Sequence, residues 1–145
     1  MRSYKETKTI QYDASLLYSI IMDVENYPNF LPWCSYATIL SKNEDYLEAE
    51  LNITFKGVSE SYVSRVFGVE DGSSYKIEVV GISGPFKFLK NNWVIESVNN
   101  GSEVKFSIDF ELKSRILDMV VGVFFSTITE KMVAAFEDRA KELSV

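Results

Sequence analysis

The sequence of 145 residues contains no histidine, a single cysteine and only three prolines. Without histidine, the most common general base, the Ser–His and Cys–His catalytic arrangements and the most common metal ligand are all missing. The lone Cys34 can form neither an intramolecular disulfide nor a thiolate zinc site, and we expect it to be a small buried apolar residue. No glycine-rich segment has the spacing of a phosphate-binding loop. We therefore predict a protein that is not an enzyme and that requires no metal and no cofactor.

Basic runs and long apolar runs are also missing. The formal net charge is −6 and no cluster of Lys or Arg interrupts the acidic balance, so we do not expect DNA binding. The N-terminus has no apolar signal-peptide core, and the longest apolar stretch, Met119 to Phe125, is too short to cross a bilayer. We expect a cytoplasmic, bacterial protein whose low cysteine content suits a reducing compartment.

Alternating apolar and polar residues dominate the middle of the sequence. The alternation predicts strands over 4–12, 35–41, 46–55, 59–70, 75–80, 86–98 and 103–112. Between the first two, Asp13 can cap a short helix with one apolar face, which Pro28 and Pro32 prevent from continuing. We expect the residues before the two prolines to be extended. The last segment, 114–143, predicts one long helix, and we expect it to bend near Gly122 or Ser126 because it would be longer than the strands.

This order of elements predicts an α+β fold in a single domain covering residues 1–145. A strongly curved antiparallel sheet of about six to seven strands, wrapped around the long C-terminal helix, buries every apolar face. Such a sheet does not close perfectly on a helix. If its inward residues include Leu89, Trp93, Phe106 and Phe110, a tunnel between sheet and helix can remain, although each of these residues could equally be plain core.

The stretch NYPNFLPWC, residues 26–34, concentrates rigid and apolar side chains. Its two prolines fix the backbone, so Tyr27, Phe30, Leu31 and Trp33 should form a rigid wedge at the mouth of the sheet. The wedge either plugs the core or forms the rim of a binding site. A second ambiguous residue is Arg65, in an apolar strand, which is either an ordinary exposed side chain or an anchor for a polar ligand group.

Residues 25–34, ENYPNFLPWC, resemble the YP-x-F-x-P-x-C signature of the coenzyme Q-binding START-domain family, within the larger polyketide cyclase/dehydrase-like superfamily. Segments 64–66, 84–93, 110–117 and 134–143 also look like family blocks in family order, so the resemblance covers essentially the whole chain. It implies a helix-grip fold with two short helices after the first strand and an internal hydrophobic tunnel. It also implies a ligand such as ubiquinone or another isoprenoid or lipid, and no catalytic residues in most members.

The resemblance transfers the motif residues Tyr27, Pro28, Phe30, Pro32 and Cys34, and places the 84–86 loop and Trp93 near the tunnel. Together with the inward aromatic residues, the expected ligand-binding set is Tyr27, Pro28, Phe30, Leu31, Pro32, Trp33, Phe55, Arg65, Pro85, Phe86, Leu89, Trp93, Phe106, Phe110, Val120 and Phe124.

The first expected function is a carrier or chaperone for ubiquinone that supports respiration, with transient contact to a membrane surface and a location peripheral to the inner membrane. Because the bacterial branch of the family includes ribosome-association toxins, a ribosome-binding regulator is the alternative, disfavoured by the acidic charge. An aromatase- or cyclase-like enzyme is a third, supported by fold alone.

Between Ile116 and Phe125 only Asp118 and Gly122 are not apolar. A helix covered by a sheet on one side needs an apolar stripe and not a full collar. Either the curved sheet and the proline-rich wedge bury this segment all round, or Val121, Phe124 and Phe125 form a movable gate that touches the membrane, with Gly122 giving flexibility.

Overall fold

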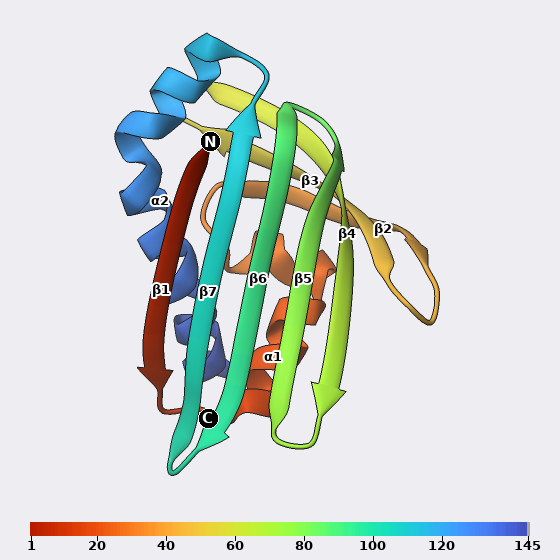
Figure 1. Cartoon of the computed structure of the whole chain (residues 1–145), viewed down its shortest axis with the longest axis vertical. Helices are drawn as coiled ribbons and strands as arrows, with labels where there is room; N and C mark the ends of the chain where they lie inside the picture. Colours follow the sequence, from red (N-terminus) through yellow and green to blue (C-terminus); the bar gives the residue numbers. More distant parts are fainter. Residues whose placement is uncertain (145) are drawn as a thin grey trace.

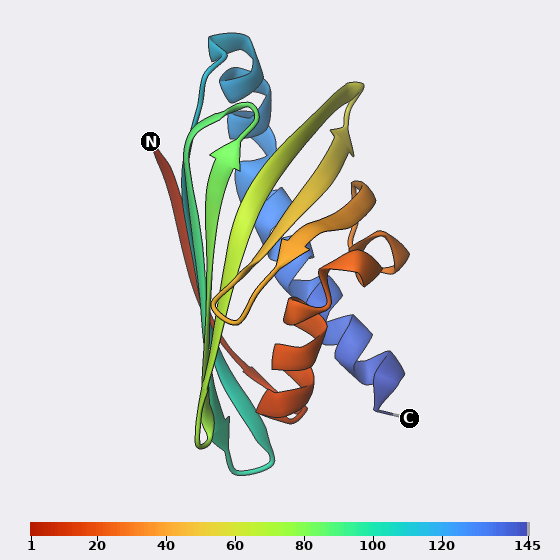
Figure 2. The same ribbon diagram turned by 90° about the vertical axis from the view of Figure 1, so that its right-hand side faces the viewer.

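A seven-stranded antiparallel sheet carries its helices on one face (Figures 1 and 2). The computed structural model describes residues 1–144. Its elements follow in the order β1 (Arg2–Ile10), α1 (Ala14–Met22), η1 (Val24–Asn29), β2 (Cys34–Lys42), β3 (Leu47–Phe55), β4 (Val58–Asp71), β5 (Ser74–Ser83), β6 (Phe86–Val98), β7 (Gly101–Leu112) and α2 (Arg115–Leu143). The strand order in the sheet is β1-β7-β6-β5-β4-β3-β2. The predicted α+β helix-grip fold is confirmed.

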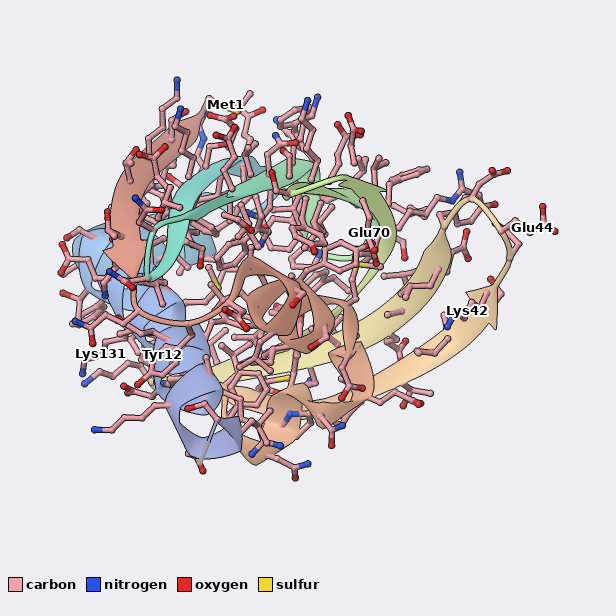
Figure 3. The ribbon with its side chains drawn as sticks, turned by 90° about the horizontal axis from the view of Figure 1, so that it is seen from below. Met1, Tyr12, Lys42, Glu44, Glu70 and Lys131 are labelled. Atoms are coloured by element: carbon pink, nitrogen blue, oxygen red, sulfur yellow. The ribbon has the colours of Figure 1, made fainter. Side chains whose placement is uncertain are left out.

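The curvature of the sheet has a local cause in its register. Pairing shifts occur in β2, between β4 and β5 at Val63, and at the start of β6 beside Phe86. Such bulges bend a strand and increase its twist. Figure 3 shows the result at the β2–β3 end, where the hairpin marked by Lys42 and Glu44 extends away from the body of the molecule. The sheet therefore closes on α2 along β1 and opens along β2 and β3.

The segment after α1 differs from the expectation. We expected the residues before the prolines to be extended, but Val24–Asn29 forms a 3-10 helix that contains both Tyr27 and Pro28. A 3-10 helix this short requires few backbone donors, so the missing N–H of Pro28 costs little. Asp13 occupies the N-cap position of α1, as predicted, but its side chain makes no capping hydrogen bond.

The C-terminal helix α2 is one element from Arg115 to Leu143. Ser114 caps it as predicted, because its Oγ accepts a hydrogen bond from the backbone N–H of Leu117 at 3.2 Å. The helix is not interrupted at Gly122 or Ser126, and Figure 1 shows its axis curving along the edge of the sheet. Its buried residues all lie in the second half, from Thr129 to Ala140.

The apolar interior divides into two clusters. The main cluster joins α1, the lower part of the sheet and the second half of α2, and Trp93 sits at its centre against Phe106 and Phe136. The smaller cluster is built on Leu89, Phe110 and Leu112 under the first half of α2. The two clusters do not merge completely, and the space between them is the candidate site.

Candidate functional site: an apolar cavity beneath α2

A cavity of about 220 Å³ lies between the sheet and the first half of α2. Its floor is the inner face of β3, β4, β6 and β7, its roof is α2, and one end is formed by the segment before β2. The lining residues are Leu31, Pro32, Trp33, Ile53, Phe55, Val58, Glu60, Tyr62, Pro85, Phe86, Leu89, Ile108, Phe110, Leu112, Leu117, Val120, Val121, Phe125, Ile128, Thr129 and Met132.

A wall of aromatic rings closes the cavity on the side of β6 and β7. Phe86 packs edge-to-face on Phe110 at a centroid distance of 5.9 Å, and Phe110 packs on Phe125 of α2 at 5.2 Å. Tyr62 of β4 continues the wall, with its ring 5.3 Å from that of Phe86. Rings in edge-to-face contact hold one another in place, so this side of the cavity is preformed.

On the side of β2 and β3, where the sheet is open, a second row of rings bridges the sheet to the helix. Trp33 packs on Phe55 at 5.1 Å, and Phe55 packs on Phe124 of α2 at 5.4 Å. The Nζ atom of Lys56 lies 5.3 Å from the centroid of the Phe124 ring. We call Trp33, Phe55, Phe124 and Lys56 the aromatic seam. It covers the cavity where no strand does.

Trp33 adopts a backbone conformation that bulky residues rarely occupy, with φ of 65°. Its carbonyl oxygen accepts a hydrogen bond from the backbone N–H of Thr54 at 2.8 Å, which attaches the segment before β2 to β3. Strain of this kind persists only where the surroundings impose it, and it concentrates at ligand sites. The backbone therefore aims the indole of Trp33 at Phe55 and the rim of the cavity.

The proline-rich motif splits between two roles. Leu31, Pro32 and Trp33 line the cavity. Tyr27, Pro28 and Phe30 do not. The rings of Tyr27 and Phe30 each pack edge-to-face on Phe136 at 5.4 Å, in the main core. The Tyr27 hydroxyl donates a hydrogen bond to the carbonyl oxygen of Ile21, which ties η1 back to α1.

The first half of the motif is thus a structural brace and its second half is the rim. Both readings offered by the sequence, core plug and binding rim, apply to different residues. Pro28 takes part through its place within η1, which orients the tyrosine and phenylalanine towards α2.

The sequence also placed Trp93 and Phe106 in the tunnel, and the structure corrects this. The two rings pack on one another at 4.7 Å, and Phe136 of α2 covers Trp93 at 5.1 Å. The indole N–H of Trp93 donates to Oδ1 of Asn91 at 3.1 Å. Alternation shows that a residue points inward, but it does not show where α2 approaches the sheet closely enough to fill the space.

Arg65 is likewise not part of the cavity. Its Nε donates to Oε1 of Glu48 at 2.7 Å, and its guanidinium lies over the ring of Tyr46 at 4.9 Å. Glu48 is its direct cross-strand neighbour in the register of β3 and β4. The hydrogen bond to Glu48 raises the pKa of the guanidinium. Of the two readings, the ordinary exposed side chain is correct.

The remaining expected residues are where the sequence placed them. Phe55, Pro85, Phe86, Leu89, Phe110 and Val120 line the cavity. Phe124 lies in the aromatic seam and contributes to the cover, though not to the lining.

Sequence reasoning missed several lining residues, among them Ile53, Tyr62, Ile108 and Met132. The signal for Tyr62 was available: it pairs with the inward-facing Leu51 across β3 and β4, and it shares the parity of the buried Ser64 and Val66. The signal for Met132 was not, because helical spacing cannot show how far along α2 the cavity extends.

The polar groups near the cavity are held in their neutral forms. Burial raises the pKa of the Cys34 thiol to about 11, so it stays protonated and unreactive at neutral pH, in line with its expected role as a small apolar residue. Burial also raises the pKa values of the Tyr27 and Tyr62 hydroxyls well above the ordinary range. Among residues 1–144, Glu60 is the one charged residue of the lining, and it is solvent-exposed.

Of the two expectations for the segment 116–125, burial all round is wrong. Val121 and Phe125 face the cavity, while the opposite side of the helix is open to solvent. Ile116, Met119 and Val123 are exposed by 77%, 70% and 77%. Their spacing of three and four residues places them on one face, which we call the outer apolar face. The helix is therefore neither buried all round nor exposed through Val121 and Phe125.

The sequence matches a family model and curated relatives. The family model described as polyketide cyclase/dehydrase and lipid transport matches residues 10–137. The chain is 44% identical to the ribosome association toxin RatA of Rickettsia prowazekii, over 99% of both chains. It is 31% identical to the mitochondrial coenzyme Q-binding protein COQ10 homolog B of Xenopus laevis, covering 94% of this chain and 57% of that protein.

Among solved structures, an aromatase/cyclase from Streptomyces sp. R1128 superposes with a TM-score of 0.82 at 16% identity, over 99% of this chain and 96% of that one. At this identity the likeness concerns the fold alone.

Proposed function

The chain belongs to the polyketide cyclase/dehydrase and lipid transport family, and we propose that it binds ubiquinone or a similar hydrophobic isoprenoid and carries it to and from membranes. The observation that supports this most strongly is the apolar cavity between the sheet and α2. Preformed concave sites lined by aromatic and aliphatic side chains are the usual form of a lipophilic ligand site.

The size of the cavity limits what it can enclose. At about 220 Å³ it is smaller than the roughly 300–1,000 Å³ of pockets that enclose drug-sized ligands. It therefore accommodates a ring or about two isoprene units, and a longer tail has to leave through the rim. Ten buried carbons gain roughly 8 kcal/mol at about 0.8 kcal/mol per carbon, which corresponds to about micromolar affinity.

A bilayer offers the same tail nearly the same free energy. The protein should consequently exchange its ligand with membranes and not strip them of it, which is the behaviour that a carrier requires.

The outer apolar face supplies a surface for that exchange. α2 is the one helix of the described chain that is long and apolar enough to cross a membrane, but its second half is packed in the core, so we propose that it lies on the membrane and does not span it. Four cations, Lys56, Lys87, Lys113 and Arg115, lie at the same end, and none forms a salt bridge within residues 1–144.

Two of these cations lie where the fold does not favour them. Lys113 and Arg115 flank the N-terminus of α2, where the helix dipole favours anions. An anionic lipid surface would compensate that unfavourable position. The outer apolar face and the cations are then presented together.

The proposal is tested by equilibrium binding of a quinone bearing two isoprene units, followed by quenching of tryptophan fluorescence. Trp33 lies on the cavity rim, so occupancy should quench its emission, with a dissociation constant in the micromolar range. The control is Trp33→Phe, which should lose the quenching while calorimetry still detects binding. Absence of binding at tens of micromolar by both methods would rule out the carrier.

A second candidate is association with the ribosome, favoured by the 44% identity to a ribosome association toxin over nearly the whole length of both chains. The net charge of −6 opposes it, because binding to RNA is dominated by phosphate contacts. Sedimentation with ribosomal subunits at two salt concentrations separates the candidates. We expect no co-sedimentation at physiological salt, and stable co-sedimentation that resists salt would favour the second candidate.

We further propose that ligand binding is not coupled to catalysis. Glu60, on the exposed rim, is the one carboxylate of the lining within residues 1–144, and the Tyr62 hydroxyl is held protonated by burial. General acid–base catalysis is most efficient with a positioned group whose pKa lies near the working pH. Prolonged incubation of a bound quinone should therefore return it chemically unchanged, as read by mass.

A further inference from the structure

Tyr62, which lines the cavity, has a hydroxyl group without a hydrogen-bond partner within residues 1–144. Tyr62 lies on the inner face of β4, opposite Leu51, with its ring against Phe86. Its Cβ is held from behind by the backbone of Gly84, where any side chain would collide with it. The ring is thus fixed in place. Within residues 1–144 its hydroxyl makes no hydrogen bond, although the residue lines the cavity.

The neighbouring polar groups show that this is not the general pattern. The Tyr27 hydroxyl donates to Ile21, the Trp93 indole donates to Asn91, and the Cys34 thiol contacts the carbonyl oxygen of Tyr36. No fully buried side-chain nitrogen or oxygen of the described chain lacks a partner. The Tyr62 oxygen therefore keeps accessible surface, and the residue that carries it lines the cavity.

We propose that the Tyr62 hydroxyl donates a hydrogen bond to an uncharged oxygen of the bound ligand, such as a carbonyl or an ether, and so directs the oxygen-bearing end of the ligand toward the main core. The proposal rests on the ligand-binding function proposed above and specifies its substrate class. An isolated donor in an apolar site favours ligands that carry an acceptor over ligands that lack one, because a ligand without an acceptor leaves that donor unpaired.

The charges around the cavity further limit which ligands it can bind. The lining contains no cation in residues 1–144, and its one anion is Glu60 at the rim. A carboxylate placed inside would be an unpaired buried charge, which is strongly unfavourable. Tyr62 cannot compensate as a cation would. The favoured ligands are thus neutral and carry an oxygen acceptor, whereas free fatty acids and plain hydrocarbons are disfavoured.

One other donor could take this role. The indole N–H of Trp33 also has no hydrogen-bond partner within the described chain, and Trp33 lines the rim. The two donors differ in position: Tyr62 packs against residues of both apolar clusters, while Trp33 belongs to the aromatic seam over the open side. The experiment has to separate them.

Three probes of matched length are used: a quinone with two isoprene units, the corresponding hydrocarbon, and the corresponding carboxylic acid. Wild type should bind the quinone most tightly. Tyr62→Phe keeps the ring and should weaken quinone binding about tenfold, the size expected of one hydrogen bond in an apolar site, while hydrocarbon binding stays unchanged. Tyr27→Phe removes a hydroxyl outside the cavity and should leave the preference for quinone over hydrocarbon as in wild type.

A spectroscopic readout makes the test independent of affinity. The infrared carbonyl stretch of the bound quinone should lie at lower frequency in wild type than in Tyr62→Phe, because a hydrogen bond weakens the C=O bond. If wild type binds none of the probes, the carrier function and the anchor both fail. If it binds quinone and hydrocarbon alike, or if Trp33→Phe and not Tyr62→Phe removes the preference and the shift, the carrier function stands and the assignment of Tyr62 is overturned.

Discussion

The guanidinium of Arg2 donates two hydrogen bonds of 3.0 Å to the carboxylate of Asp118, from Nε to Oδ1 and from Nη2 to Oδ2. It also donates to the carbonyl oxygen of Asp118 at 3.1 Å. The contact joins the first residue of β1 to the part of α2 that roofs the cavity. It passes directly over Gly122, where a Cβ atom would collide with the guanidinium. Gly122 therefore makes room for this contact, and flexibility is not needed to explain it.

Gly122→Ala should consequently behave differently in two backgrounds. In wild type, the gain in helix propensity of about 1 kcal/mol is offset by displacement of Arg2, so the free energy of unfolding should change little. In Arg2→Ala, the same substitution should stabilise by about 1 kcal/mol, since nothing is displaced. Urea unfolding of wild type, the two single variants and the double variant gives the coupling energy between positions 2 and 122. Equal stabilisation in both backgrounds would show that Arg2 does not occupy the space over Gly122.

Tyr27→Phe tests the bracing role of the first half of the motif. Loss of the hydrogen bond to the carbonyl oxygen of Ile21 should lower the free energy of unfolding by about 1 kcal/mol. Affinity for a short quinone should stay within about twofold of wild type, because Tyr27 does not line the cavity. A large loss of affinity with unchanged stability would return Tyr27 to the binding site.

The sequence determined the fold more fully than the site. Alternation at 46–55 and 103–112 predicted β3 and β7 nearly to the residue, because each has one buried face and a side-chain period of two. The cavity depends instead on the distance between α2 and the sheet. Phe106 and Phe110 both point inward from β7, four residues apart. Phe106 is nevertheless buried in the main core, whereas Phe110 lines the cavity.

Individual motif residues show the same limit. The two prolines placed Tyr27 and Trp33 in one rigid wedge, and only the packing of Phe136 against Tyr27 separates the brace from the rim. The ion pair between Arg65 and Glu48 follows from their pairing across β3 and β4. That pairing depends on the turn at Lys56 and Gly57, both of which have φ in the left-handed region.

Alkaline pH should lower the free energy of unfolding, because the Cys34 thiol and the Tyr4 hydroxyl have raised pKa values in the folded protein. Burial raises the pKa of Cys34 from 9.0 to about 11, and burial with the hydrogen bond to Glu6 raises that of Tyr4 from 10.0 to about 12. A raised pKa means that the folded state holds its proton longer, so the associated stability is complete below about pH 9 and is lost as the pH rises toward 11–12.

The measurement is the urea midpoint between pH 7 and 11. Cys34→Ala should reduce the decline between pH 9 and 10, where the thiol is the first of these groups to titrate in the unfolded chain. A midpoint that does not change over this range in wild type would contradict the burial of these groups.

Aspartate on the outer apolar face should separate membrane contact from folding. Ile116→Asp, Met119→Asp and Val123→Asp change side chains that are at least 70% exposed, so stability should change by less than about 0.5 kcal/mol. Sedimentation with vesicles containing anionic lipid should be lost. Val69→Asp, at an apolar residue 57% exposed on β4, is the matched control and should retain binding. Equal loss in the control would make the effect one of net charge.

Native mass spectrometry of protein purified without detergent tests the central claim, that the cavity beneath α2 holds a neutral hydrophobic ligand. Wild type should carry an added mass, and solvent extraction should release an uncharged, oxygen-bearing lipophilic compound. Val121→Phe places a larger side chain in the cavity, and it should fold with an unchanged or raised melting temperature and carry no such mass. An unloaded wild type that also fails to take up a short quinone, or a Val121→Phe protein that is loaded as well as wild type, would contradict the account.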